Sequence, residues 1–510
     1  MPARPHPSLP EDHVSYRMPR RSLLLSAAAL TATAGPLAGL ARAAARTPKV
    51  LVIGLDGALL TRIKDADAPH LDALMAAGLT APSSIYADPL APTMSGPGWS
   101  TLITGVWPDK HNVKDNAFTG HRFAQYPDFL TRVETAKPAL TTCAVSSWAP
   151  ITDTVFSPKV DIRISTPSAE YDTGTTSRAV ARLGDGDPAA VFVQLDNIDH
   201  AGHTYGAAST QYTDAIHTAD TQVGRLVAAV RGRPTYASED WLIMVTADHG
   251  HTDAGGHGGS TLAERSTFLI ATGPTLTPGS VRHDVKMPDV AASALAHLGI
   301  PLDPAWGLDG RPVQQPAPDD FDALRPQLTA RTDETGIPAA VLGYTHTPPT
   351  GWTVDNSAMG TGGVTEWRGW TFTTDEFWTQ AQRDQSRESN VRARGVFAVA
   401  DGDEWQDKGF TGTFDSTLVS PARTVTGGRT ATLTHTTYYR HEAPQKGEVL
   451  VAYDDGTPLT VKTYTADVPS RTETLTLQVP AGARTARIRF RHTGGNNWYW
   501  VVDQVRLTQA

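Results

Sequence analysis

Strand-like apolar runs alternate with helix-like patterns over more than half of this chain. Between residues 49 and 311, runs such as KVLVIG, AVFVQL, WLIMVTA and FLIATG are separated by segments with helical periodicity, among them 69–78, 210–231 and 289–299. The apolar runs are continuous rather than alternating, which suits strands buried on both faces. This rhythm predicts an α/β fold in which helices cover both faces of a mostly parallel sheet.

The character of the sequence changes after Pro312. A Pro-rich acidic stretch, QQPAPDD, leads into a region in which Thr, Gly and aromatic residues dominate and runs such as TATLTHT, EVLVAY and ARIRFR have a period of two. Seven of the 12 Trp lie in this region, and turn signals recur at short spacing. We therefore predict a first domain over residues 46–312, a linker over 313–336 and an all-β domain, a β-sandwich or jelly roll, over 337–510.

The first 45 residues have the pattern of an export signal. Arg20 and Arg21 precede an apolar run over residues 23–40, and small residues follow it. This order predicts a cleaved signal over residues 1–45 rather than a membrane anchor. The paired arginines resemble a bacterial twin-arginine signal, and Met18 is a possible start. We expect a secreted or extracytoplasmic protein with no membrane span in the mature chain.

Composition excludes several other classes. With 40% hydrophobic and 19% charged residues, the chain is globular in composition, and its single Cys143 excludes a disulfide framework. The net charge of -9 becomes -12 without residues 1–45, when 39 basic residues stand against 51 acidic ones. The sequence has no stripe of basic residues. The electrostatic attraction to phosphates that dominates nucleic-acid affinity is therefore missing, and we do not expect binding of polynucleotides.

Polar residues gather where the predicted strands end. They are Asp56 after LVIGL, Ser95 in TMSGPGWSTLITG, Asp199 and His203 in DNIDHAGH, Asp248 and His249 after WLIMVTA, and His257 in GGHGG. Open α/β sheets bind their ligands at this edge. Asp199 and His203 are four residues apart and can share one helical face. Three carboxylates and three imidazoles suit two Zn²⁺ ions, with Mn, Fe and Ca as alternatives.

Each of these residues also has an ordinary explanation. An Asp at a strand end, such as Asp56, is more often a turn or capping residue, and Ser95 could cap a helix that begins near Gly98. His200 and His251 each neighbour a candidate ligand. For both we favour solvent exposure, or a hydrogen bond that supports a ligand, over direct binding of a metal.

The order of the segments is more specific than any one of them. LVIGLDG, LITGVWPDKHNV, DHAGH, TADHG and an HGG before FLIATGP together resemble the type I phosphodiesterase and nucleotide pyrophosphatase family of the alkaline phosphatase superfamily, over about residues 48–312. The resemblance implies an alkaline-phosphatase-like fold and hydrolysis of a small phosphoester through a phosphoserine. Ser95 is then the nucleophile, with Thr93 as the runner-up, and Asn116 binds the phosphoryl oxygens. Gly98 stands where the family has Asn.

The same resemblance implies which residues bind the two divalent ions. Asp199, His203 and His257 hold one, and Asp56, Asp248, His249 and the Ser95 oxygen hold the other. The nucleophile loop contains no Arg or Lys, and Gly96 and Gly98 leave room beside the nucleophile, so we favour a phosphodiesterase. A phosphomonoesterase is the alternative. A sulfatase is less favoured because Trp99 stands where sulfatases have Arg, and a catalytically dead binding protein is less favoured because no ligand is missing.

The predicted β domain resembles jelly-roll modules of secreted hydrolases, which indicates a possible contact with a glycan or the cell wall. Its candidate sugar-stacking residues are Trp405, Trp498 and Tyr499, although for these aromatics we favour a place inside the sandwich. Three carboxylates are candidates for a structural Ca²⁺ ion, namely Asp401, Asp403 and Asp503.

Overall fold

The computed structural model describes residues 46–86, 90–317, 319–383 and 385–509. The predicted export signal, residues 1–45, lies outside the described residues. Arg46–Ala510 forms one compact unit. Within the described part of the chain, no helix is both long enough and apolar enough to cross a lipid bilayer.

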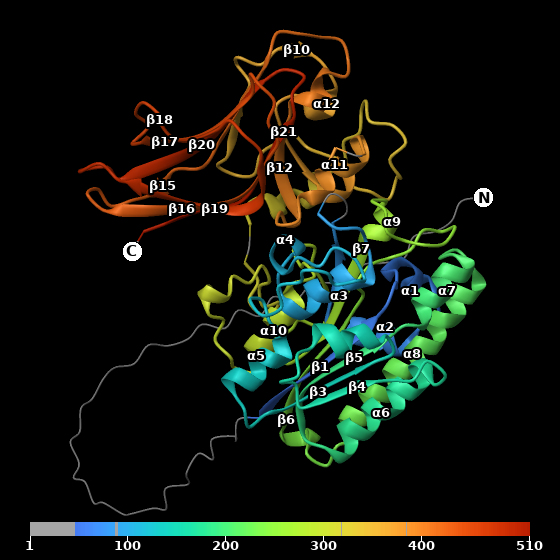
Figure 1. The fold of residues 1–510 in the computed structure, drawn as a ribbon. Coiled ribbons are helices and arrows are strands. Elements are labelled where there is room, and N and C mark those ends of the chain that lie inside the picture. The colour runs from blue at the N-terminus through green and yellow to red at the C-terminus, as the bar shows by residue number, and fades with distance from the viewer. Residues whose placement is uncertain (1–45, 87–89, 318, 384, 510) are drawn as a thin grey trace, which may run out of the picture. The chain divides into compact units, whose positions relative to one another are not determined.

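An eight-stranded sheet forms the centre of the N-terminal region, in the order β4-β3-β5-β1-β6-β7-β2-β8 (Figure 1). Its strands are β1 (Thr47–Leu55), β2 (Leu79–Ser84), β3 (Thr141–Ser146), β4 (Ile162–Ser165), β5 (Pro188–Leu195), β6 (Glu239–Thr246), β7 (Ser266–Thr272) and β8 (Ser280–Val281). The five strands from β4 to β6 are parallel, whereas β7 runs antiparallel to both β6 and β2. The predicted mostly parallel sheet is confirmed.

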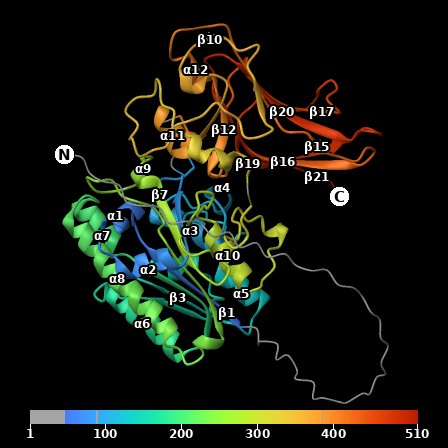
Figure 2. The ribbon, with the colours of Figure 1, turned by 180° about the vertical axis from the view of Figure 1, so that it is seen from behind.

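Helices cover both faces of this sheet (Figures 1 and 2). One face carries α1 (Leu60–Asp65), α2 (Pro69–Ala77), α6 (Tyr171–Asp185), α7 (Asn197–Tyr205) and α8 (Thr210–Arg231), and the other carries α3 (Ser95–Thr104), α5 (Phe129–Ala136) and α10 (Asp289–His297). Short helices connect them: α4 (Pro108–His111), η1 (Ile151–Val155), η2 (Tyr236–Ser238), α9 (Leu262–Arg265) and η3 (Pro304–Trp306). Successive residues of β1 point to opposite faces, so Leu51 and Ile53 join one core while Val50 and Val52 join the other. This two-sided burial explains the continuous apolar runs.

The C-terminal region contains two larger antiparallel sheets. The first has the order β11-β12-β21-β16-β19, with β11 (Trp370–Thr374), β12 (Val396–Asp401), β16 (Thr430–Tyr439), β19 (Val468–Gln478) and β21 (Tyr499–Thr508). The second has the order β18-β17-β20-β14-β9 with β15 beside β20, and comprises β9 (Thr353–Asp355), β14 (Phe414–Val419), β15 (Arg423–Thr424), β17 (Lys446–Tyr453), β18 (Leu459–Tyr464) and β20 (Thr485–Gly494). Residues of both sheets share one hydrophobic core, so the all-β character predicted for this region is confirmed.

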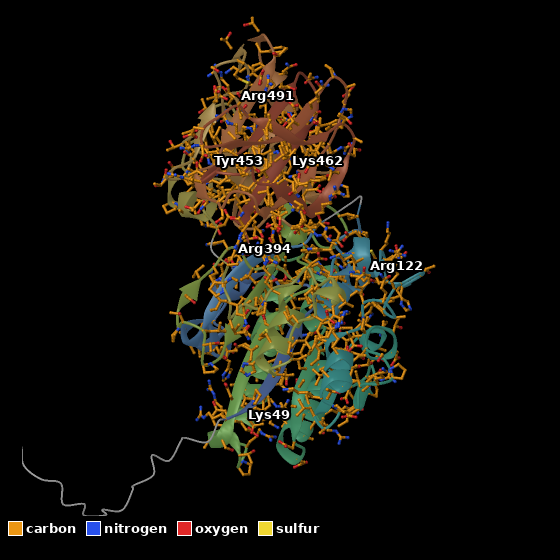
Figure 3. All side chains as sticks on the ribbon, turned by 90° about the vertical axis from the view of Figure 1, so that its left-hand side faces the viewer. Lys49, Arg122, Arg394, Tyr453, Lys462 and Arg491 are labelled. Atoms are coloured by element: carbon orange, nitrogen blue, oxygen red, sulfur yellow. The ribbon has the colours of Figure 1, made fainter. Side chains whose placement is uncertain are left out.

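Smaller elements complete the C-terminal region: η4 (Phe321–Gln327), the two-stranded pair β10 (Thr361–Gly362) and β13 (Phe410–Thr411), η5 (Thr365–Trp367), α11 (Asp375–Ala381), η6 (Arg387–Ser389) and α12 (Gly402–Gln406). Helix η4 falls in the predicted linker, and its Phe321 and Leu324 pack into the core of the β region. A buried ion pair also joins Arg394, labelled in Figure 3, to Asp289 of α10 at 2.6 Å. The domain boundaries at 312 and 337 stay a prediction.

Aromatic side chains in this region mostly fill its core. Trp405 and Tyr499 are fully buried, which removes both as sugar-stacking surfaces. Trp498 is partly buried, and the Arg440 guanidinium covers its ring at 4.1 Å. The favoured interpretation, that these aromatics pack inside the sandwich, therefore agrees with the fold for two of the three.

The three carboxylates considered for Ca²⁺ do not come together. Asp401 lies opposite Tyr499 in the β12–β21 pair, whereas Asp503 is four residues further along β21. Asp401 pairs with the buried Arg387 at 3.2 Å, and Asp503 accepts the Arg394 backbone N–H at 2.8 Å. Among the described residues these carboxylates, Asp403 included, form no metal-binding group, so the Ca²⁺ prediction is wrong. Charge and backbone partners occupy oxygens of Asp401 and Asp503 instead.

Candidate active site

Three neighbouring parallel strands deliver the candidate ligands to one edge of the sheet. Since the order is β5-β1-β6, the segments that leave the carboxyl ends of these strands are adjacent. Asp56 follows β1, and its backbone N–H donates to the carbonyl of Leu195 at the end of β5 at 2.9 Å. Asp248 and His249 follow β6, while Asp199 lies on α7 after β5. Ser95 is the first residue of α3.

One group of side chains, which we call the Ser95 site, converges on the Nε2 atom of His249. That nitrogen lies 3.3 Å from Ser95 Oγ, 3.5 Å from Asp56 Oδ1 and 3.3 Å from Asp248 Oδ2. The Nδ1 atom of His249 faces its neighbour's carbonyl, Gly250 O, at 3.2 Å. A proton on Nδ1 leaves the Nε2 lone pair directed into the site.

The outer oxygens of the two carboxylates are already occupied. Asp56 Oδ2 accepts from Trp99 Nε1 at 2.9 Å and from Gln194 Nε2 at 3.0 Å, and Asp248 Oδ1 accepts from the Gly57 N–H at 3.2 Å. The inner oxygens, Asp56 Oδ1 and Asp248 Oδ2, are buried and have no hydrogen-bond partner among the residues that the structure describes. Two buried, unpaired carboxylate oxygens beside an imidazole nitrogen fit a divalent cation.

The electrostatics of these protein groups support the fit. Burial, and then the charge of Asp248, raises the pKa of Asp56 well above its usual value. Burial and the charge of Asp199 likewise raise the pKa of Asp248, while burial and the neighbouring His257 lower the pKa of His249. Without a cation, each of these groups favours its uncharged form in this place. A bound divalent cation would reverse that preference for both carboxylates.

A second group, the His257 site, contains Asp199, His203 and His257. His257 Nε2 lies 3.4 Å from Asp199 Oδ1 and 3.0 Å from His203 Nε2, and His203 Nε2 is 3.5 Å from Asp199 Oδ2. His257 Nδ1 faces the carbonyl oxygen of Thr93 at 2.6 Å, which directs Nε2 toward Asp199. Burial acts to raise the pKa of Asp199, but hydrogen bonds from His251 and His257 lower it overall, so this carboxylate stays charged.

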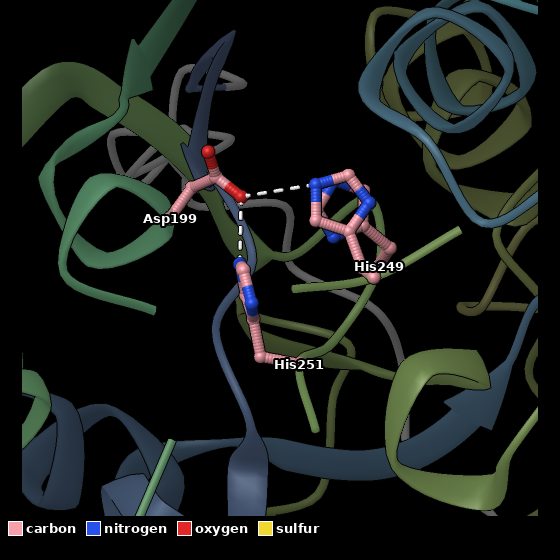
Figure 4. A group of neighbouring side chains, drawn as sticks. Asp199, His249 and His251 are labelled. Atoms are coloured by element: carbon pink, nitrogen blue, oxygen red, sulfur yellow. Dashed lines mark hydrogen bonds and ion pairs between the residues drawn. The ribbon is translucent and has the colours of Figure 1, made fainter. Parts of the chain in front are cut away.

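His251 belongs to the same cluster, in a role the sequence indicated only as an option. Its side chain is fully buried, and its Nε2 atom lies 2.7 Å from Asp199 Oδ1 (Figure 4). Asp199, His249, His251 and His257 place one ligand atom each within 4.8 Å of one another. Solvent exposure is therefore wrong for His251, whose ring instead forms a hydrogen bond with the candidate ligand Asp199. His200, by contrast, is exposed.

Ser95 does not cap its helix. The N-cap of α3 is Met94, and Ser95 is the first residue of the helix, with a side chain that is 8% exposed. Its oxygen lies at the N-terminal end of a ten-residue helix, where the helix dipole favours negative charge. Thr93, the other candidate nucleophile, is fully buried and instead donates to Gly259 O and accepts from Gly258 N–H. Thr93 thus holds the loop that carries His257.

Asn116 lies next to the nucleophile. Its Oδ1 atom accepts the Gly96 backbone N–H at 2.7 Å, and the side chain is exposed. Because the carbonyl oxygen of the amide is used in this way, its NH₂ group can donate to another oxygen. The two glycines of the loop do not provide space, contrary to expectation: a Cβ at Gly98 would lie 2.7 Å from Asp248 O, and one at Gly96 would lie 2.5 Å from Asp115 O. Close backbone approach explains both glycines.

Residues outside the predicted set also shape the site. Trp99 and Gln194 orient Asp56, and the Tyr171 hydroxyl donates a hydrogen bond to Asp196. Asp196, Asp56 and Asp199 form a third close carboxylate group. Burial raises the pKa of Asp196 to about 6. Its position one residue after strand β5 is the signal that could have identified it in the sequence.

A comparison of the sequence with known families identifies the family of this chain. The sequence pattern of the type I phosphodiesterase/nucleotide pyrophosphatase family matches residues 50–395. The chain belongs to this family. The match extends past residue 312, where the sequence resemblance was expected to end, into the first strands of the β region.

Curated relatives of this family member are distant. Human GPI ethanolamine phosphate transferase 2, catalytic subunit, is 27% identical over 157 residues, which are 29% of this chain and 16% of the relative. The mouse ectonucleotide pyrophosphatase/phosphodiesterase family member 7 is 23% identical over 237 residues, which are 41% of this chain and 51% of the relative. The chain thus spans about a sixth to a half of the length of these two proteins.

Two solved structures match part of this chain at low sequence identity and with low TM-scores. Murine ectonucleotide pyrophosphatase/phosphodiesterase 5 is 14% identical, with a TM-score of 0.39, and the match covers 50% of this chain and 95% of that one. The phosphonate monoester hydrolase of Agrobacterium radiobacter is also 14% identical, with a TM-score of 0.39 and coverage of 52% and 76%.

Proposed function

We propose that this protein is an exported two-metal phosphoester hydrolase that acts on phosphodiesters through a phosphoserine at Ser95. The observation that carries the proposal is the convergence of Ser95 Oγ, Asp56 Oδ1 and Asp248 Oδ2 on His249 Nε2, with both carboxylate oxygens buried and unpaired. A nucleophilic hydroxyl beside such a group is suited to attack on phosphorus.

The chain's own residues account for the two halves of the reaction. Ser95 Oγ attacks phosphorus and the bond to one ester oxygen breaks, which releases an alcohol that ends with the Ser95 proton. The phosphoryl group stays bonded to Ser95 and, for a diester, still carries its second substituent. Water then attacks the same phosphorus, and the Ser95 oxygen departs as the hydroxyl. The Asn116 NH₂ group donates to a non-bridging oxygen, whose negative charge grows in each transition state.

The mixed carboxylate and imidazole sites favour Zn²⁺. Asp56, Ser95, Asp248 and His249 would bind one ion, and Asp199, His203 and His257 the other. When bound, these cations supply a lowered pKa for the attacking hydroxyl and water and offset charge on the phosphoryl oxygens.

Charge near the nucleophile favours a diester over a monoester. Lys110 is engaged elsewhere, because its Nζ lies 2.7 Å from both Asp309 Oδ1 and Gly307 O. Lys114 is exposed. A monoester dianion would gain from a cation beside the metals, and neither Lys is held there, whereas a monoanionic diester needs less compensation. A phosphomonoesterase of the same superfamily is the second candidate.

A direct comparison of substrates tests the proposal. The purified protein, supplied with Zn²⁺, should hydrolyse bis(p-nitrophenyl) phosphate with a higher kcat/KM than p-nitrophenyl phosphate. A clear preference for the monoester, abolished by Lys114→Ala, would assign the second candidate. If the phosphoryl group were passed to an added alcohol rather than to water, the protein would be a transferase, the kind of enzyme for which the human relative is named. The export signal and a glycan contact through the C-terminal region are part of the proposal.

A further inference from the structure

Strand β20 presents a row of three arginines on the outer face of its sheet. In the run ARIRFR, Ile488 and Phe490 point into the core, where they are almost completely buried. Arg487, Arg489 and Arg491 therefore point outward, about 7 Å apart from one to the next. Figure 3 labels Arg491 among the side chains of this region.

The two outer arginines have carboxylate partners. Arg491 binds Asp415 through two hydrogen bonds of 2.9 and 2.7 Å, and Arg487 Nε binds Asp455 at 2.6 Å. The central Arg489 differs from both. Its Nε atom is buried and has no hydrogen-bond partner among the described residues. Asp355 lies close enough to feel the charge of Arg489, because hydrogen bonds from Ser357 and then the charges of Arg489 and Arg491 lower its pKa. No described residue, however, accepts a hydrogen bond from Arg489 Nε, and a buried donor of this kind favours an added acceptor.

Arg489 lines an open cavity of about 260 Å³. In the sheet, Leu450 of β17 lies opposite Arg489, and Thr417 of β14 lies opposite Arg491. The remaining lining residues come from β9, β14, the loop after β9 and the loop between β17 and β18: Asp355, Ser357, Ala358, Asp415 and Pro458. This volume lies below the range of drug-sized pockets and suits a ligand of about one ring.

The lining defines the chemistry of that ligand. Arg489 offers a planar donor fork that matches a carboxylate. Asp355 and Asp415 can accept hydrogen bonds from hydroxyl groups of the ligand. Their negative charges disfavour a dianion such as phosphate. Leu450 and Pro458 provide apolar surface for the C–H face of a ring. A monoanionic ring with several hydroxyl groups satisfies all three conditions.

We propose that this cavity binds a uronic acid residue of an acidic polysaccharide, with its carboxylate on Arg489. The site is formed wholly by the C-terminal β region and is separate from the Ser95 site, so the inference goes beyond the proposed hydrolase activity. In this proposal the cavity, rather than the aromatic residues Trp405, Trp498 and Tyr499, is where the C-terminal region contacts a glycan.

Titration calorimetry on the full chain tests the inference with methyl glucuronide and methyl glucoside as paired probes. We expect the glucuronide to bind at least about tenfold more tightly, since only it carries the carboxylate. Arg489→Gln should weaken glucuronide binding by about tenfold or more. Arg487→Gln is the matched control, because Arg487 lies two residues away on the same strand face and outside the cavity, and should leave binding unchanged.

Three outcomes would overturn the inference. They are absence of glucuronide binding, equal binding of the two probes, and unchanged glucuronide binding by a folded Arg489→Gln variant. Inorganic phosphate serves as a further probe, and tighter binding of phosphate than glucuronide would assign the cavity to a phosphate group instead. Ser95→Ala should not affect glucuronide binding, so failure of the hydrolase proposal and failure of this inference are distinguishable.

Discussion

The Nε2 atom of His251 lies 2.7 Å from Oδ1 of Asp199, and the imidazole ring fits between two glycines. A Cβ atom at Gly57 or at Gly202 would lie 2.7 Å from His251 Cδ2, so neither position accepts a larger residue without moving the ring. The two glycines therefore fix the position of the His251 ring next to the Asp199 carboxylate. We infer that His251 is a positioning residue that turns Asp199 toward His203 and His257.

Replacing His251 should weaken metal binding at the His257 site. We expect His251→Asn to lower the affinity for Zn²⁺ at the His257 site by about 10- to 100-fold. This is the usual effect of removing a residue that forms a hydrogen bond to a metal ligand. Competition with a chromogenic chelator measures this affinity independently of catalysis. His200→Asn is the control, since His200 adjoins Asp199 in sequence but is exposed. Equal zinc affinity in both variants would show that His251 does not position the ligand.

Removing the Ser95 hydroxyl should abolish turnover without unfolding the protein. We expect Ser95→Ala to reduce kcat by about three orders of magnitude or more, because the attacking oxygen is lost. Ser100→Ala on the same helix is a matched control, because Ser100 is fully buried and its hydroxyl has no hydrogen-bond partner among the described residues. Loss of this hydroxyl should be nearly neutral. Acid quenching of the wild type with a labelled diester should trap the labelled phosphoryl group on Ser95. A trapped label on Thr93 would contradict the assignment.

Two metal ions per chain are expected, and each site should empty separately. His257→Ala should remove the ion at the His257 site first, and Asp248→Asn should remove the ion at the Ser95 site. Elemental analysis after dialysis gives the stoichiometry, and a chelator should abolish the activity of the wild type. A single ion per active chain, retained in His257→Ala, would refute the two-site assignment.

His492 should make the protein less stable in mild acid. Burial lowers the pKa of His492 to about 3, and neither ring nitrogen has a hydrogen-bond partner in the described part of the chain. The unfolded chain takes up this proton near pH 6.5 while the folded chain does not, so the stability that His492 contributes is present above pH 6.5 and is lost as pH falls toward 3. The loss is up to about 1.4 kcal/mol per pH unit. Urea unfolding at pH 7.5 and 5.0 should show a smaller difference for His492→Phe than for the wild type.

The buried ion pair between Arg394 and Asp289 should contribute to the stability of the whole unit. Arg394 donates to both Asp289 oxygens, at 2.6 and 2.9 Å, and both side chains are almost fully buried. Arg394→Met leaves the carboxylate without its partner, so we expect a loss of about 3–5 kcal/mol in the free energy of unfolding. Arg423→Met, which breaks the exposed pair with Asp320, should cost at most about 1 kcal/mol. Equal effects in urea unfolding would contradict the argument.

The class of the fold and the family were predictable from the sequence. Continuous apolar runs between helical segments require strands covered on both faces, and the observed sheet lies between two helical layers. The candidate ligands could be found in the same way, because Asp56, Asp199 and Asp248 follow strands whose ends a parallel sheet must bring together. Period-two runs after residue 336 likewise indicated antiparallel sheets. These features follow from the local spacing of apolar and polar residues, which can be read directly from the sequence.

Other features were decided only by the tertiary structure. Whether His251 faces solvent or Asp199, which oxygen of Asp56 stays unpaired, and whether Trp405 lines a surface or fills a core all depend on segments distant in the chain. The expected Ca²⁺ site failed for this reason, since Arg387 and the register of β12 with β21 hold Asp401 and Asp503 apart. Composition shows which groups are available, but the direction of a side chain and the occupancy of its hydrogen bonds follow from packing between elements far apart in sequence.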